Sequence, residues 1–176
     1  MTRICAYCNT ENQDHRSHCE SCGAVLTGKE TALDKQEAPK AVYETLLAIC
    51  EKYDANEWCN TVETFSPKKR SHAIEAFDIP QGERVIMLYD DTLFGSNNLG
   101  FAVCESGLYW KNSWHTPTKR TKLTWEQYLQ REIALDGFEI DLGRGDKISV
   151  ATQGTKERQM IAELLQQIRA ALATNV

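Results

Sequence analysis

The chain has few of the features that mark a membrane anchor or a polyanion-binding protein. Its 176 residues contain no apolar run long enough to span a bilayer, so we expect no transmembrane segment. The stretch from Met1 to Cys5 lacks the apolar core of a signal peptide, and we therefore expect a cytoplasmic protein. Acidic residues outnumber basic ones by 25 to 20, and the net charge of −5 predicts no general attraction to nucleic acid or anionic lipid.

The motifs of common enzymes are also missing. The sequence has no Walker loop, no GxGxxG, no GxSxG, no HExxH and no kinase-type set of motifs. We therefore expect a protein that is not an enzyme. Hydrophobic residues make up 41% and charged residues 26% of the chain, which is typical of a globular protein with one good core.

Four of the seven cysteines form two CxxC pairs, Cys5 with Cys8 and Cys19 with Cys22. An odd number of cysteines suits a reducing compartment, where thiols bind metal or fill core space. Four thiolates at this spacing are typical of a closed tetrahedral site, so we predict one structural Zn²⁺ ion. Residues 1–26 contain few large apolar side chains, and this part of the chain should therefore need the metal to fold.

This segment, with a CxxC, a polar loop and a second CxxC followed by Gly23, resembles the bacterial zinc-ribbon family. The resemblance covers about the first 25 residues. Zinc ribbons serve as DNA-, RNA- or protein-binding modules, so the resemblance implies the metal and leaves the partner open.

We predict four parts of the chain: a zinc ribbon at 1–26, a flexible linker at 27–40, a helical segment at 41–80 and an antiparallel sheet with a capping helix at 81–176. The linker is small, polar and of mixed charge. Apolar residues at three- and four-residue steps predict a helix over 41–53. Ser66 as N-cap and Pro67 at the first helical position predict a second helix, ending near Phe77.

Short strand patterns dominate after Glu83. Strands are expected at 85–89, 101–104, 108–111, 138–142 and 147–151. Residues 105–107 should form a hairpin turn in which Gly107 is available for a positive φ. An amphipathic helix is expected from 155 to about 173. The fold class is therefore α+β, with a strongly bent antiparallel sheet or a small barrel covered by a C-terminal helix.

Residues 88–96, 100–103 and 107–112, with the sequences LYDDTLFGS, GFAV and GLYWKN, look like a segment of bacterial proteins of unassigned function. The region from about 83 to 173 resembles pleckstrin-homology-like or GRAM-like modules. That resemblance implies a bent sheet closed by one helix. It also implies binding of proteins or lipid head groups rather than catalysis.

Asp90 and Asp91 are adjacent, so on a strand their side chains point to opposite faces and are poorly placed to act as a paired acid and base on one substrate, although a turn could reorient them. We expect Asp90, Asp91 and Thr92 to hydrogen-bond the loop backbone and shape the corner that follows. A metal or ligand role is the alternative.

Trp114 lies in the segment Asn112 to Pro117, which is typical of a loop and could present an aromatic anchor to a partner. Core packing is the equally weighted alternative for Trp114, and it is the expectation for Trp110 and Trp125. His115 has no nucleophile or metal partner nearby in the sequence, so we expect a solvated loop histidine, and we include it with Trp114 in the candidate partner-binding group.

Two basic clusters stand out, 68–70 and 119–122, and Lys119 and Arg120 complete the set of candidate partner-binding residues. A run of charge is usually a solvated face, but the two clusters could contact phosphate if the fold brings them together.

The leading hypothesis is a non-catalytic, zinc-containing adaptor or scaffold that binds a protein partner in the bacterial cytoplasm. The first alternative is a nucleic-acid-binding accessory factor that uses the ribbon and the basic clusters. The second is a metal-dependent hydrolase that uses Asp90, Asp91 and His115. Nucleic acid and lipid head groups remain alternative partners.

Overall fold

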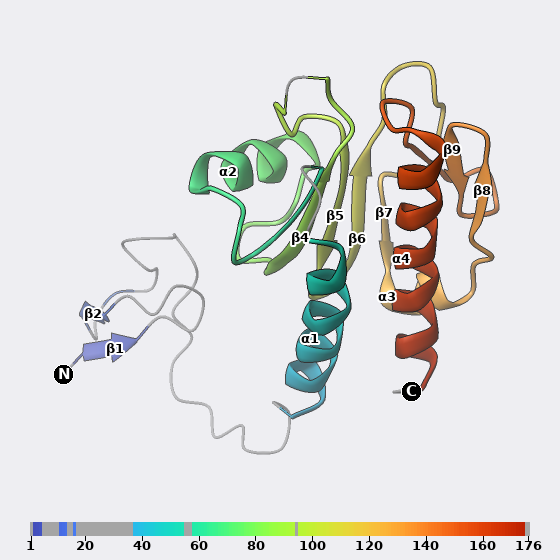
Figure 1. The fold of residues 1–176 in the computed structure, drawn as a ribbon. Helices are drawn as coiled ribbons and strands as arrows, with labels where there is room; N and C mark the ends of the chain where they lie inside the picture. The colour runs from blue at the N-terminus through green and yellow to red at the C-terminus, as the bar shows by residue number, and fades with distance from the viewer. Residues whose placement is uncertain are drawn as a thin grey trace.

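The fold is a mixed α+β arrangement of helices and antiparallel sheets (Figure 1). The structure is a computed structural model, and it describes residues 2–4, 11–13, 16, 37–54, 58–93 and 95–174. The four predicted zinc ligands, Cys5, Cys8, Cys19 and Cys22, and residues 27–36 of the predicted linker lie outside the described residues. Among the described helices, none is both long enough and apolar enough to cross a bilayer.

The N-terminal part contains a short antiparallel pair of strands, β1 (Thr2–Ile4) and β2 (Glu11–Gln13). Arg3 lies opposite Asn12 in this pair. The two strands flank the first CxxC pair in the sequence.

The main sheet has five antiparallel strands in the order β3-β4-β5-β6-β7. Their bounds are Cys59–Thr61, Val85–Asp90, Gly100–Cys104, Gly107–Lys111 and Lys122–Thr124. The predicted hairpin of β5 and β6 is confirmed, but the reason given for its glycine is wrong. Gly107 has no positive φ; instead, a Cβ at this position would collide with the carbonyl oxygen of Leu123 on β7.

A second, three-stranded antiparallel sheet has the order β10-β9-β8. Its strands are β8 (Ala134–Asp136), β9 (Glu139–Asp141) and β10 (Lys147–Ser149). The short helix α3 (Trp125–Leu129) separates β7 from β8 in the chain, and no strand ladder joins the two sheets within the described residues. The sheets are therefore open, and the barrel alternative does not form.

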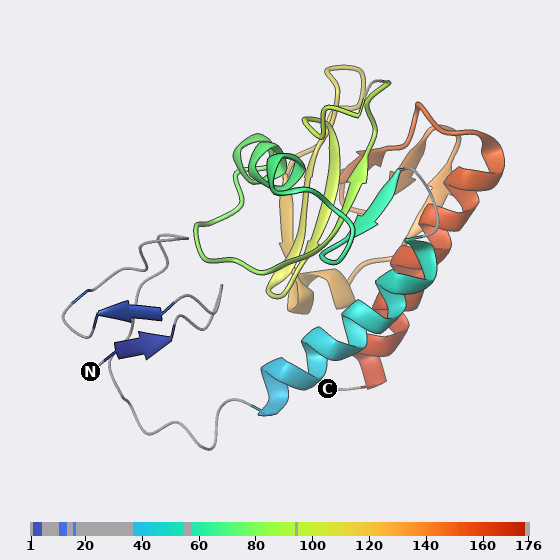
Figure 2. The ribbon, with the colours of Figure 1, turned by 60° about the vertical axis from the view of Figure 1, so that its left-hand side comes forward.

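Three further helices cover the main sheet. They are α1 (Glu37–Cys50), which continues into a 3₁₀ turn at Glu51–Tyr53, α2 (Pro67–Ala76) and α4 (Thr155–Thr174). The start of α2 at a Ser66 cap is confirmed, because the Ser66 side chain accepts a hydrogen bond from the backbone N–H of Lys69. Figures 1 and 2 show α2 on one side of the main sheet, with α1, α4 and the second sheet on the other.

Both faces of the main sheet are buried, because alternate residues of the central strands β5 and β6 enter different clusters. On β5, Phe101 and Val103 pack toward α1 and α4, whereas Ala102 and Cys104 pack toward α2. The predicted apolar face of α4 is confirmed as core. Its buried residues include Ile161, Leu164, Leu165, Ile168 and Leu172.

The segment 41–80 is not a separate helical unit. It contains the edge strand β3, and Leu46 and Ile49 of α1 belong to the same core as α4. Helix α1 also begins at Glu37, so it includes the end of the predicted linker. Residues 81–176 alone would lack the edge strand β3 of the main sheet and the part of the core that α1 supplies.

Candidate partner-binding loop

The loop between β6 and β7 carries the most exposed large apolar side chain of the described residues. Trp114 is 86% exposed, against 74% for Leu93 and 60% for Phe138. The alternative that Trp114 fills the core is therefore wrong, whereas Trp110 on β6 is fully buried. Trp125 is half-buried and donates its indole N–H to the carbonyl oxygen of Glu105 across 2.8 Å.

Trp114 rests against the neighbouring His115. The two ring centroids lie 3.5 Å apart, with an interplanar angle of 35°. Both side chains are exposed, so together they form an aromatic surface at the tip of the loop. An indole with two χ angles offers a large contact area at a small cost in conformational entropy, which is why tryptophan often anchors interfaces.

The side chain of Asn112 fixes the base of this loop. Its amide nitrogen donates to the carbonyl oxygens of Thr116, at 3.2 Å, and Lys147, at 2.8 Å. Its amide oxygen accepts from the backbone N–H of Ser149 at 2.9 Å. One side chain thus joins the loop to β10, so Trp114 is presented from an anchored backbone.

A second set of contacts ties the far half of the loop to the same strand. Thr118 Oγ1 accepts from the backbone N–H of Lys147 at 3.3 Å and donates to the carbonyl oxygen of Arg120 at 2.9 Å. The backbone N–H of Lys119 donates to the carbonyl oxygen of Gly145 at 3.3 Å. The loop is therefore held at both ends against the second sheet.

The segment 111–122 contains cations and no carboxylate. Its basic residues are Lys111, Lys119, Arg120 and Lys122, and all four are exposed. Within the described part of the chain, no carboxylate forms an ion pair with any of them. Basic side chains therefore surround the aromatic surface of Trp114 and His115. This arrangement favours a partner on which acidic residues surround an apolar patch.

The loop between β4 and β5 lies at the same end of the main sheet (Figures 1 and 2). Asp90 accepts hydrogen bonds in this loop from the backbone N–H of Thr92 at 2.9 Å, from the Thr92 hydroxyl at 2.6 Å and from the backbone N–H of Asn97 at 3.1 Å. These are the contacts expected of a residue that shapes a loop. They also hold the turn that exposes Leu93.

Asp91 points into the protein instead. Its Oδ1 accepts from the Tyr89 hydroxyl and from both the backbone N–H and the hydroxyl of Thr152, and its Oδ2 accepts from the Ser149 hydroxyl. Asp90 is 3% and Asp91 5% exposed. Neither carboxylate forms a hydrogen bond or an ion pair with His115, whose ring lies on Trp114, so the three residues of the hydrolase alternative are not brought together.

The two basic clusters are not joined. Lys69 on α2 donates to the side chain of Asn60 on β3, at one edge of the main sheet, while the second cluster adjoins β7 at the other edge. Four strand spacings separate these edges, which is roughly 19 Å. A single phosphate cannot bridge that distance.

The three cysteines of the described residues are buried free thiols, Cys50, Cys59 and Cys104. Burial raises the pKa of Cys59 to about 12 and also raises the pKa of the other two. They are therefore protonated at neutral pH and poor nucleophiles. In the described ranges, no group of three or more His, Cys, Asp or Glu side chains could hold a metal ion.

The sequence did not identify three residues as parts of this site, namely Asn112, Thr118 and Ser149. Asn112 and Ser149 are 37 residues apart, and no local pattern reports that pairing. The only sequence sign was an asparagine at the start of a loop, a position where amides often bond to nearby backbone.

Comparisons with protein-family models, with curated proteins and with solved structures found no match to this chain.

Proposed function

We propose that the protein is a non-catalytic, zinc-containing adaptor of the bacterial cytoplasm that binds a protein partner through its β6–β7 loop. The observation that carries the proposal is Trp114, 86% exposed at the tip of a loop whose base is fixed by Asn112. An exposed tryptophan on an anchored backbone loses little conformational entropy when it binds a partner.

The order of the elements supports the resemblance to pleckstrin-homology-like modules. Strands β4 to β7 of the main sheet are followed by the three strands of the second sheet and then by helix α4. Such modules mostly bind proteins or lipid head groups. Helices α1 and α2 and the edge strand β3 are additions to that plan in this chain.

The zinc ribbon remains part of the proposal. The hairpin of β1 and β2 brackets the first CxxC pair, as in a ribbon whose knuckle lies between two short strands. Cys5, Cys8, Cys19 and Cys22 would supply four thiolates to a structural zinc ion. The ion would hold the shape of the module and perform no chemistry.

A protein partner fits these features better than nucleic acid does. The chain is acidic overall, and its basic clusters lie at opposite edges of the main sheet. Binding to a phosphate backbone depends on many adjacent cations, each releasing counterions. The β6–β7 loop offers one aromatic tip with a basic margin instead, which is an arrangement suited to one apolar pocket on a partner.

Affinity purification of the tagged full chain from its native cell, followed by mass spectrometry, tests the proposal. The Trp114→Ala variant should lose a specific co-purifying protein that the wild type retains. Phe138→Ala is the matched control, because Phe138 is also an exposed aromatic residue but lies in the β8–β9 turn. Equal capture by all three proteins would contradict the assignment of the loop.

A separate vesicle-binding assay distinguishes binding to a lipid surface from binding to a protein partner. If the loop serves a protein partner, retention of the protein on vesicles containing anionic lipid at physiological salt should not depend on Trp114. Retention that Trp114→Ala abolishes would assign the same loop to a membrane surface and overturn the choice of a protein partner.

A further inference from the structure

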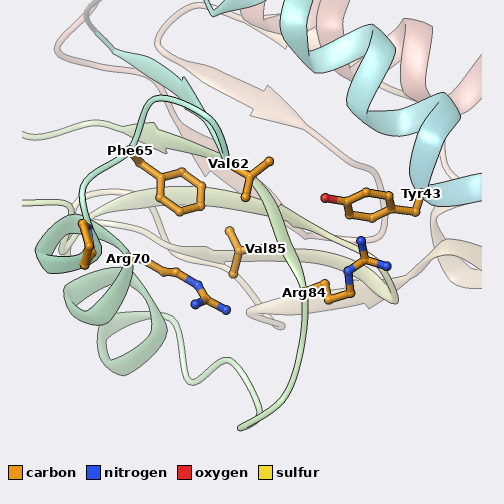
Figure 3. A pocket seen from close by; sticks show the side chains of 7 residues that line it. Tyr43, Val62, Phe65, Arg70, Arg84 and Val85 are labelled. Atoms are coloured by element: carbon orange, nitrogen blue, oxygen red, sulfur yellow. The ribbon is translucent and has the colours of Figure 1, made fainter. Parts of the chain in front are cut away.

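A pocket of about 320 Å³ lies on the main sheet, well away from the β6–β7 loop. Its lining comes from α1, from the segment around β3 and α2, and from the start of β4 (Figure 3). The lining residues are Tyr43, Val62, Phe65, Pro67, Arg70, Arg84 and Val85. Val85 pairs with Cys104, whereas Lys111 pairs with Gly100, so the pocket and the loop lie toward opposite ends of the sheet.

The floor of the pocket is apolar and its rim is basic. Phe65 and Val85 are buried, and Val62 is half-buried. Arg70 extends from α2 toward Val85, while Arg84 lies beside the ring of Tyr43 (Figure 3). No carboxylate is among the lining residues.

The two arginines differ in how they are held. The Arg84 guanidinium lies 3.6 Å from the centroid of the Tyr43 ring and 3.5 Å from a carboxylate oxygen of Glu105. These contacts fix the position of the Arg84 guanidinium and leave some of its N–H donors free to bind a ligand. The exposed Arg70 guanidinium has no hydrogen-bond or ion-pair partner among the described residues.

The hydroxyl of Tyr43 adds a third polar group. Within the described residues it has no hydrogen-bond partner, and it points toward Val62 over the apolar floor (Figure 3). Arg70 and Arg84 lie on either side of Val85 (Figure 3), and two cations at the rim with one hydroxyl suit the double charge of a phosphate monoester better than the single charge of a carboxylate. The volume is at the small end of ligand pockets, so the apolar part of the ligand must also be small.

We propose that this pocket binds a phosphate monoester carried on a small apolar group. Arg70 and Arg84 hold the phosphate, and Phe65 and Val85 contact the apolar part. Backbone N–H groups of the α2 N-terminus contribute little, because Pro67 has none and the Lys69 N–H is already bonded to Ser66. The site is independent of the proposed protein-binding loop.

The test uses phenyl phosphate and, as a neutral control, phenol, titrated into the full-length protein labelled on its valine methyl groups. Phenyl phosphate should shift the NMR signals of Val62 and Val85 in a saturable manner, and phenol should not. Arg70→Gln should weaken binding about fivefold, because it removes one charge-assisted contact. The matched control Lys68→Gln lies outside the pocket lining on the same helix and should change the affinity by less than about twofold.

The Glu105→Gln variant tests the same site through an expected gain in affinity, which a folding defect cannot produce. It removes the carboxylate that competes for Arg84, so phenyl phosphate should bind about twofold more tightly. A gain in affinity cannot come from a damaged fold. Unsaturable shifts, equal binding of phenol, or equal losses in Arg70→Gln and Lys68→Gln would overturn the proposal.

Vesicles identify the source of the phosphate. Retention on vesicles containing phosphatidate, but not on phosphatidylcholine alone, and its loss in Arg70→Gln would assign the monoester to a lipid head group whose acyl chains stay in the bilayer. Binding of phenyl phosphate without such retention would assign it to a soluble ligand. Both outcomes support the site, whereas failure of phenyl phosphate to bind would overturn it.

Discussion

The Ser149 hydroxyl donates a hydrogen bond to Asp91 Oδ2 across 2.7 Å and thereby joins the two sheets. Asp91 follows β4 of the main sheet, and Ser149 ends β10 of the second. Thr152, just before α4, donates to the other oxygen of the same carboxylate. Because no strand ladder connects the sheets in the described chain, this carboxylate is a principal polar link between them.

Replacing Asp91 by Asn should destabilise the protein by about 1–3 kcal/mol, because the amide presents a donor to a site lined with donors. Urea unfolding of the variant measures the loss in the free energy of unfolding. The control is Asp136→Asn, where the side chain is 71% exposed and its ion pair with Lys147 is long, at 3.7 Å. Equal stability of the two variants would show that the link is dispensable.

Truncation of the buried face of α4 should be costly. Ile161→Ala, Leu164→Ala and Ile168→Ala should each lower the free energy of unfolding by about 2–5 kcal/mol, since each side chain is at most 1% exposed. Thermal or urea unfolding provides the measurement. Gln159→Ala, on the exposed side of the same helix, should be nearly neutral. Neutral effects at all three core positions would mean that α4 is peripheral.

Alkaline pH should destabilise the protein through its buried thiols. Burial raises the pKa of Cys59 from its ordinary 9.0 to about 12, so the folded chain keeps a proton that the unfolded chain releases between these values. The unfolded state then binds fewer protons, and the free energy of unfolding falls as pH rises. Each such group contributes a slope of about 1.4 kcal/mol per pH unit.

Urea unfolding of the wild type and of Cys59→Ala at pH 9.5 and 10.5 measures this contribution. The variant should lose about 1.4 kcal/mol less than the wild type over that unit of pH. Identical pH dependence in both proteins would show that Cys59 already titrates normally in the fold.

Metal removal should affect only the N-terminal part of the chain. Purified protein should contain one zinc per chain, and chelation should abolish the structure of residues 1–26 while leaving the α1-to-α4 region folded, because that region has its own apolar core. Metal analysis and amide NMR spectra before and after chelation give the answer. A single cooperative loss of all structure would contradict the independence of the two parts.

Strong local patterns predicted their elements correctly. Helix α4 followed from its apolar periodicity, and α2 followed from Ser66 and Pro67. Helix α3 was missed although Thr124 and Gln127 have the spacing of a capping box, and they form one in the structure. Its five residues are too few to show a helical period.

Tertiary pairing explains the other omissions. Strand β3 has three residues, and only its ladder with β4 makes it a strand. Arg131 and Asp146 form a buried ion pair at 2.9 Å that holds the turn before β10, yet neither residue stands out in the sequence. For the candidate site, the loop and its tryptophan were predictable, whereas the anchoring of Asn112 to Lys147 and Ser149 required the fold.

The most direct test of the adaptor proposal is the dissociation constant of the purified partner for the wild type and for Trp114→Ala, measured by calorimetry at 50 mM and 300 mM salt. We expect Trp114→Ala to weaken binding at least about tenfold with unchanged fold and zinc content, because the variant removes the anchor. Salt should weaken the wild-type complex by less than about fivefold, since only a few marginal cations take part. The contrary result would be tight binding of DNA or RNA at low salt that falls by orders of magnitude at high salt. Abolition of that binding by charge reversal at Lys68, Lys69, Lys119 and Arg120 would replace the adaptor with a nucleic-acid-binding factor.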